Sequence, residues 1–157
     1  PYFPEQDVST LLREKGLTLA AAESCTGGLI AKRMTDLSGA SQIFMGGVVS
    51  YTNQVKARVL GVPQALLDEY GAVSEPVARA MAEGVRRITG ADVGVSVTGV
   101  AGPDRDDRGN EVGTVYIALT CADGTHSRLC RFGALSRAEI RTKAADAVFA
   151  LVQSKLG

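Results

Sequence analysis

The chain has 157 residues, of which 45% are hydrophobic and 22% are charged, as is usual for one folded domain with its own core. Basic and acidic residues number 17 each, so the sequence lacks the positive charge that typifies proteins binding nucleic acid or anionic membranes. No apolar run approaches the roughly 18 residues of a membrane span, no signal peptide is visible, and a start at Pro1 rather than methionine indicates a trimmed or processed chain.

The first half of the chain is predicted to alternate helices with two short strands. In order, these elements are helix 5–15, strand 17–22, helix 29–37, strand 44–51, helix 52–60 and helix 63–70. The second strand contains Gly46 and Gly47, which predict either a bulge or a place where a ligand approaches the backbone closely.

The second half is predicted to hold two long helices and three strands. Its elements are a helix from about 75 to 90, a strand over 93–98, a loop over 99–112, hairpin strands over 114–120 and 126–132, and a last helix to about 155. Ser74 is expected to cap the first of these helices, and Ser136 with Glu139 forms a capping box for the last. Because no repeat or linker interrupts this order, we predict one α/β domain over residues 1–157, with a mixed sheet to which the hairpin adds antiparallel strands.

The three cysteines are predicted to be free. Cys121 and Cys130 flank Asp123-Gly124, a favourable hairpin turn that would pair Cys121 with His126 and Cys130 with Ile117. The sulfurs would then lie about 13 Å apart along the strands, whereas a disulfide requires Cα atoms within about 7 Å. Free thiols indicate a reducing, cytoplasmic location. With a single histidine and no close cysteine pair, we expect no metal site and no cofactor.

Three loops rich in small polar residues each follow an apolar strand: Glu23–Gly28, Gly46–Asn53 and Thr98–Pro103. If the three strands run parallel, these loops meet at one edge of the sheet and form a pocket. The first turn, with Thr26 and Gly27, opens a helix, and a helix N-terminus favours an anion.

Ser24 in the first of these loops has three interpretations: a nucleophile, a ligand for an anion, or a helix cap. A Ser-His-Asp triad is disfavoured because the only histidine, His126, lies beside the predicted hairpin tip. Lys32 lies two helical turns away, about 12 Å, which is too far to share a proton. Tyr51 and Lys56 would approach Ser24 if the second strand ends beside the first; otherwise Lys56 is a solvated lysine and Tyr51 packs on the core.

Other residues keep two interpretations each. Cys25 is a rival nucleophile, since a thiol at a helix N-terminus has a lowered pKa, or it is a small buried filler. The charged run Asp104–Arg108 is a solvated loop or a mobile lid over the pocket. Arg141, one turn into the last helix, either binds a phosphate or lies at the surface. The turn with Thr98, Gly99 and Gly102 either contacts an anionic ligand or only reverses the chain.

Five segments in this order resemble the CinA C-terminal domain family, whose enzymes are nicotinamide mononucleotide amidohydrolases of the PncC type. The segments are Glu23–Gly28, Gly46–Asn53 with Lys56, Gly71–Glu75, Thr98–Pro103 and Gly113–Tyr116. The resemblance covers nearly the whole chain and departs from the family at Asp104–Arg108, where glycine is more usual.

This resemblance implies a three-layer α/β/α sandwich, a homodimer without metal, and hydrolysis of the carboxamide of nicotinamide mononucleotide to nicotinate mononucleotide and ammonia in pyridine nucleotide recycling. It places the catalytic serine, tyrosine and lysine on Ser24, Tyr51 and Lys56, and the glycine-threonine loop near the substrate on Thr98 and Gly99. The oxyanion donors are expected at the helix start around Thr26 and Gly27 or at Gly46 and Gly47.

The alternative is a catalytically silent module of a competence- or damage-inducible protein that binds a nucleotide or a partner. Longer family members carry an additional N-terminal domain, so the chain is expected to be a stand-alone deamidase or an excised C-terminal domain. In neither case do we expect nucleic acid or a membrane as partner.

Overall fold

The structure, a computed structural model, describes residues 3–157 and contains a five-stranded sheet in the order β2-β1-β3-β4-β5. The strands are β1 (Leu19–Glu23), β2 (Phe44–Val49), β3 (Val93–Gly99), β4 (Thr114–Cys121) and β5 (Gly124–Arg131). β1 pairs in parallel with both β2 and β3, whereas β4 runs antiparallel to β3 and β5. The predicted mixed sheet is confirmed.

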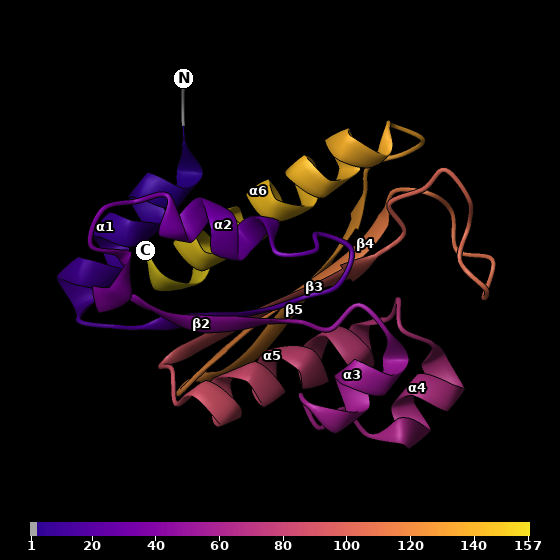
Figure 1. The fold of residues 1–157 in the computed structure, drawn as a ribbon, viewed down its shortest axis with the longest axis horizontal. Coiled ribbons are helices and arrows are strands. Elements are labelled where there is room, and N and C mark those ends of the chain that lie inside the picture. Colours follow the sequence, from indigo (N-terminus) through magenta and orange to yellow (C-terminus); the bar gives the residue numbers. More distant parts are fainter. Residues whose placement is uncertain (1–2) are drawn as a thin grey trace.

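Helices cover both faces of this sheet (Figure 1). One face carries α1 (Pro4–Lys15), α2 (Leu29–Thr35) and α6 (Arg137–Leu156), and the other carries α3 (Asn53–Arg58), α4 (Gln64–Tyr70) and α5 (Glu75–Thr89). A short 3-10 helix, Ala40–Gln42, precedes β2. The result is the three-layer α/β/α sandwich that the resemblance implied.

Strand β1 lies inside the sheet, between β2 and β3, and is buried on both faces because its residues alternate between two cores. Leu19 and Ala21 belong to the core beneath α1, α2 and α6, whereas Ala20 and Ala22 belong to the core against α5. Next to it, Gly94 of β3 lets α5 approach closely, since a Cβ there would lie 2.4 Å from the Ala82 carbonyl oxygen. The small residues therefore fix the distance between α5 and the strands that end at the site.

The bulge predicted in the second strand is present. The pairing of β1 with β2 shifts between Leu19, opposite Phe44, and Ala20, opposite Gly46, so Met45 is the extra residue. Gly46 has φ +152°, a backbone conformation that side chains disfavour.

Two helix starts behave differently from each other. Ser136 and Glu139 form the predicted capping box of α6, with both reciprocal hydrogen bonds present. Ser74 occupies the N-cap position of α5, but its side chain does not cap the helix and its hydroxyl donates to the Gly71 carbonyl oxygen at 2.8 Å. The predicted side-chain cap at Ser74 is therefore wrong.

The register of the hairpin also differs from the prediction. Cys121 lies opposite Gly124 rather than His126, and Cys130 lies opposite Val115 rather than Ile117. The turn is thus one residue earlier, and this register places the hydroxyls of Thr120 and Thr125 2.8 Å apart. Cys121 and Cys130 remain far apart along the ladder, and all three cysteines are free.

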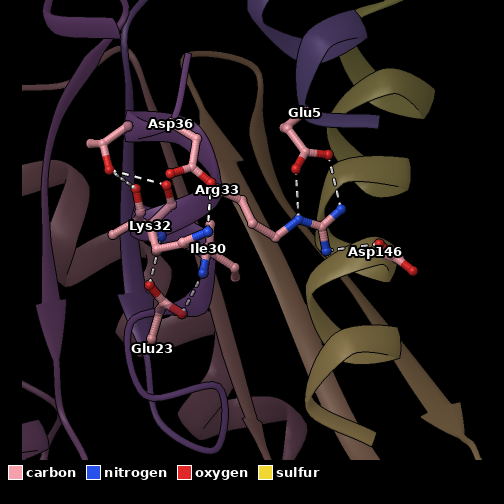
Figure 2. A network of polar contacts seen from close by, with 9 residues as sticks. Glu5, Glu23, Ile30, Lys32, Arg33, Asp36 and Asp146 are labelled. Atoms are coloured by element: carbon pink, nitrogen blue, oxygen red, sulfur yellow. Dashed lines mark hydrogen bonds and ion pairs between the residues drawn. The ribbon is translucent and has the colours of Figure 1, made fainter. Parts of the chain in front are cut away.

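A nearly buried arginine joins the three helices of one face. Arg33 of α2 forms a two-pronged ion pair with Glu5 of α1 at 2.8 and 2.9 Å and contacts Asp146 of α6 at 2.8 Å (Figure 2). Its guanidinium also lies over the Phe149 ring, 4.9 Å from the centroid. The pairing lowers the pKa of Glu5 and raises that of Arg33.

Replacing Arg33 with methionine is expected to lower the free energy of unfolding by about 3 kcal/mol, because it leaves the buried Glu5 carboxylate without its partner. The double variant with Glu5→Gln should lose less than the sum of the two single changes. Since the folded pKa of Glu5 is lowered, its contribution is present above the unfolded pKa of 4.5 and is lost as the pH falls through the folded value. Urea unfolding at pH 7 and pH 3 tests both statements. Simple additivity of the two changes would contradict the first, and an equal cost of Arg33→Met at the two pH values would contradict the second.

Candidate active site

The loops after β1, β2 and β3 meet at one edge of the sheet, as expected for parallel strands. Together they line a cleft of about 440 Å³, a size within the range of small-molecule sites. Six of the predicted residues line it: Ser24, Tyr51, Lys56, Thr98, Gly99 and Gly102.

Ser24 follows β1 directly, and its amide donates to the Val97 carbonyl oxygen at 3.0 Å. Lys56 comes from α3 and is only 1% exposed. Its Nζ lies 2.9 Å from Ser24 Oγ and 2.7 Å from the Ser50 carbonyl oxygen. The serine and lysine are thus in direct contact although 32 residues separate them in the chain.

Burial lowers the pKa of Lys56 from 10.5 to about 8. Neither hydrogen-bond partner of its ammonium is a carboxylate, so the charged form gains little to offset its desolvation. A lysine with this pKa is partly neutral near pH 7–8, and its amine can then accept the hydroxyl proton of Ser24.

The neighbouring thiol has the opposite property. Cys25 lines the cleft but is only 5% exposed, and burial raises its pKa from 9.0 to about 12. The expected lowering of this pKa at a helix N-terminus is therefore wrong, and the physical reason is desolvation of the thiolate. Cys25 is a buried thiol, with little thiolate available near pH 7.

Tyr51 lies in the wall of the cleft with 55% of its surface exposed. Its hydroxyl accepts a hydrogen bond from Arg137 Nη2 at 2.7 Å, while the other guanidinium nitrogen, Nη1, donates to the Gly102 carbonyl oxygen at 2.5 Å. Arg137 was missed at the sequence level, although it directly follows the Ser136 cap. Its position in the sequence could have indicated it, because Arg137 is the first residue of α6 and that helix begins beside the cleft.

The loop after β3 forms the opposite wall. The Thr98 hydroxyl donates to the Ala72 carbonyl oxygen at 2.9 Å, which ties this loop to the segment before α5. Ala72 and Val73 line the cleft as well, so this hydrogen bond joins two parts of its wall.

The N-terminus of α2 already holds an anion from the chain itself. The buried Glu23 carboxylate accepts from the Thr26 hydroxyl at 2.6 Å and from the amides of Gly28 and Ala31 at 3.2 and 3.0 Å. It also accepts from the Ile30 amide at 2.9 Å (Figure 2). The expectation that a substrate anion binds there, with Thr26 as a ligand, is wrong because Glu23 occupies the helix N-terminus and Thr26 is 0% exposed.

Four more predicted binding residues do not line the cleft. Gly46 and Gly47 lie within β2, upstream of its carboxyl end, where they accompany the bulge. Gly27, with φ +59°, leaves room for Arg141, whose Nη2 would lie 3.1 Å from a Cβ at this position. Arg141 itself donates to the carbonyl oxygens of Cys25 and Thr26 rather than facing the cleft.

The charged run is anchored, which opposes its interpretation as a mobile lid. Arg108 donates to three carbonyl oxygens at the end of α4, those of Leu67, Asp68 and Glu69, at 3.2, 2.5 and 3.0 Å. Within the loop, Asp106 accepts from the backbone amides of Arg108 and Asn110 at 3.1 and 2.7 Å. Asp104 and Asp106 line the cleft as part of this fixed wall.

Within residues 3–157, no three His, Cys, Asp or Glu side chains gather so as to hold a metal ion. Over the same residues, no helix combines the length and apolar character needed to cross a membrane.

The fold and the cleft define an α/β domain with a cleft at the carboxyl ends of parallel strands and a buried serine–lysine pair within it. The profile of the CinA C-terminal domain family matches residues 3–156. The chain belongs to this family.

Relatives and solved structures agree with this assignment. The chain is 57% identical over 122 residues to a putative competence-damage inducible protein of Desulforudis audaxviator and 56% identical over 135 residues to a CinA-like protein of Geobacter sulfurreducens. These matches cover 78% and 86% of the chain but only 30% and 32% of the relatives, so the chain spans about a third of their length. The crystal structure of the competence damage-inducible protein A of Klebsiella pneumoniae superposes with a TM-score of 0.94 at 31% identity, covering 98% of this chain and 94% of the other. The competence/damage inducible protein of Agrobacterium tumefaciens gives 0.91 at 34% identity, with 98% and 96% covered.

Proposed function

We propose that this domain is a serine amidohydrolase that converts nicotinamide mononucleotide and water to nicotinate mononucleotide and ammonia. The contact between Ser24 Oγ and Lys56 Nζ at 2.9 Å supports the class of reaction. The choice of substrate rests on the resemblance of the five sequence segments to mononucleotide amidohydrolases.

In the first half-reaction, neutral Lys56 takes the proton of Ser24 as Oγ bonds to the carboxamide carbon. The carbonyl oxygen becomes an oxyanion, which backbone amides beside the nucleophile stabilise. The C–N bond then breaks, and Lys56 returns its proton to the nitrogen, so that ammonia leaves and an acyl-serine ester remains.

In the second half-reaction, water attacks the ester while Lys56 again accepts a proton. The tetrahedral intermediate releases Ser24 Oγ, which recovers its proton from Lys56. The carboxylic acid that remains gives its proton to solvent and leaves as a carboxylate. Lys56 can serve in each step without a relay, because its amine contacts Ser24 directly; Tyr51 pairs with Arg137 instead.

The cleft has the charges that a mononucleotide needs. Among the described residues lining it, Lys56 and Arg137 are the cations, and the more exposed of the two, Arg137, suits the 5′-phosphate. Arg137 thus replaces Arg141, because Arg137 lines the cleft and Arg141 does not. Asp104 lines the same cleft and suits the positively charged pyridinium ring.

Ammonia release from nicotinamide mononucleotide, followed with a coupled glutamate dehydrogenase assay, tests this proposal. We expect turnover by the wild-type domain and at least a third of that rate in Cys25→Ala, because the thiol is buried and its pKa is raised to about 12. No turnover by the wild-type domain would favour the silent binding module. Loss of turnover in Cys25→Ala with an unchanged circular dichroism spectrum would move the nucleophile to Cys25.

A further inference from the structure

Arg141 binds two peptide units just after the nucleophile, Cys25–Thr26 and Thr26–Gly27. Its Nε donates to the Cys25 carbonyl oxygen at 3.1 Å, and its Nη2 donates to the Thr26 carbonyl oxygen at 3.0 Å. The contact joins α6 to a turn more than 100 residues earlier in the chain. Gly27 favours this contact, because its φ is +59° and a Cβ there would lie 3.1 Å from Arg141 Nη2.

The same turn is held from its inner side by Glu23, whose carboxylate accepts from the Thr26 hydroxyl and from the start of α2. In addition, the Gly27 amide donates to the Ser24 carbonyl oxygen at 3.0 Å. The carbonyls of residues 24, 25 and 26 therefore all have donors, and the turn has little freedom to rotate its peptide planes.

A trans peptide unit places its C=O and N–H on opposite sides. The hydrogen bonds to the Ser24 and Cys25 carbonyls therefore also set the directions of the Cys25 and Thr26 N–H groups, which belong to the same two peptide units. Within residues 3–157 no other residue accepts a hydrogen bond from the Cys25 N–H, which contacts only the sulfur of its own side chain, and Cys25 lines the cleft next to Ser24. A donor of this kind, on the residue after the nucleophile, is suited to stabilise an oxyanion.

We propose that Arg141 is a positioning residue for catalysis: by binding the Cys25 and Thr26 carbonyls, it holds the Ser24 hydroxyl against Lys56 and keeps the Cys25 amide available to the reacting carbonyl oxygen. The proposal rests on the serine chemistry proposed above but not on the identity of the substrate. Arg141 does not line the cleft, so it acts through the turn and not on the ligand.

A second arginine of α6, Arg137, supports this inference. Arg137 and Arg141 are four residues apart, so they lie on one face of α6. Arg137 binds the Gly102 carbonyl and the Tyr51 hydroxyl, while Arg141 binds the nucleophile turn. The start of α6 therefore connects the loops that follow all three parallel strands.

The test compares Arg141→Met and Arg141→Lys with Lys143→Met, a control that removes an exposed positive charge from the same helix. Two rates are measured: ammonia release, as kcat and KM, and phosphonylation of Ser24 by a fluorophosphonate reagent, followed by intact mass. The reagent forms an Oγ–P bond and expels fluoride, so it reports nucleophile activation without nicotinamide mononucleotide.

Arg141→Met should lower kcat and the phosphonylation rate by about 10²-fold, the usual cost of a misplaced catalytic group. KM should stay within about threefold of the wild-type value, since Arg141 makes no contact within the cleft. Arg141→Lys should lose less than Arg141→Met, and added guanidinium should restore part of the rate of Arg141→Met. Lys143→Met should match the wild type.

Phosphonylation of Arg141→Met at the rate of the Lys143→Met control would overturn the proposal. A rise in KM with unchanged kcat would return Arg141 to the role of a phosphate ligand. If Arg141→Met does not fold, Arg141→Lys decides, and wild-type rates in that variant would also overturn it. Phosphonylation that depends on Arg141 in a domain that releases no ammonia would refute the substrate while supporting the positioning role.

Discussion

Ser24→Ala is expected to reduce ammonia release by about 10⁴-fold or more, because the variant has no atom to form the acyl intermediate. The fold should persist, since the Ser24 side chain makes one hydrogen bond, to Lys56, and Lys56 keeps its second partner, the Ser50 carbonyl oxygen. Thermal unfolding of the variant should therefore remain a single transition near the wild-type temperature.

Ser41→Ala, at an exposed position outside the cleft, is the matched control and should retain full activity. Trapping adds a second measurement: a fluorophosphonate should label the wild-type domain once, at Ser24, and should not label Ser24→Ala. Residual activity above a tenth of wild type in Ser24→Ala would exclude this serine as the nucleophile.

Part of the site could be predicted from the loops that follow the apolar strands. Three apolar segments that each end in small polar residues would share one edge if they ran parallel, and β1, β2 and β3 do run parallel. The same reasoning brought Lys56 toward Ser24, because the absence of a usable histidine left lysine as the candidate base. The pairing itself needed the actual placement of α3 after β2.

The anion at the helix start illustrates why the remaining features were missed. A helix N-terminus after a glycine turn is a general anion site, but the sequence does not say which anion fills it. Glu23 is the last residue of β1, and its side chain bends back to the amides of Ile30 and Ala31. Only the folded structure shows that the chain supplies its own carboxylate.

Long side chains caused the other errors. Arg137 and Arg141 lie one helical turn apart, and spacing alone does not decide which reaches the cleft and which reaches the backbone behind it. In the same way, the run Asp104–Arg108 has the composition of a solvated loop, yet Arg108 fixes it to the end of α4. An arginine can cross several ångströms to bind carbonyl oxygens, and composition carries no information on that partner.

The second large effect is expected at Lys56. Lys56→Met should lower kcat by about 10³-fold, because it removes the base while keeping the length of the side chain. In the wild type, kcat/KM should rise tenfold per pH unit below about pH 8 and level off above it, since only the neutral amine accepts the Ser24 proton. A profile that is flat from pH 6 to 9 would show that Lys56 is not the base.

The same substitution should stabilise the fold at pH 7, where the wild type buries a charged ammonium. Because the folded pKa of about 8 lies below the unfolded value of 10.5, the unfolded chain binds the extra proton between these pH values. The stability of the wild type relative to Lys56→Met must then rise with pH, by about 3 kcal/mol between pH 8 and pH 10.5. Urea unfolding of both proteins across this range measures the difference, in which all shared titrations cancel. If the difference in free energy of unfolding between the two proteins did not change with pH, the pKa of Lys56 would not be lowered in the folded state. Lys56 would then stay protonated near pH 7–8 and could not accept the Ser24 proton.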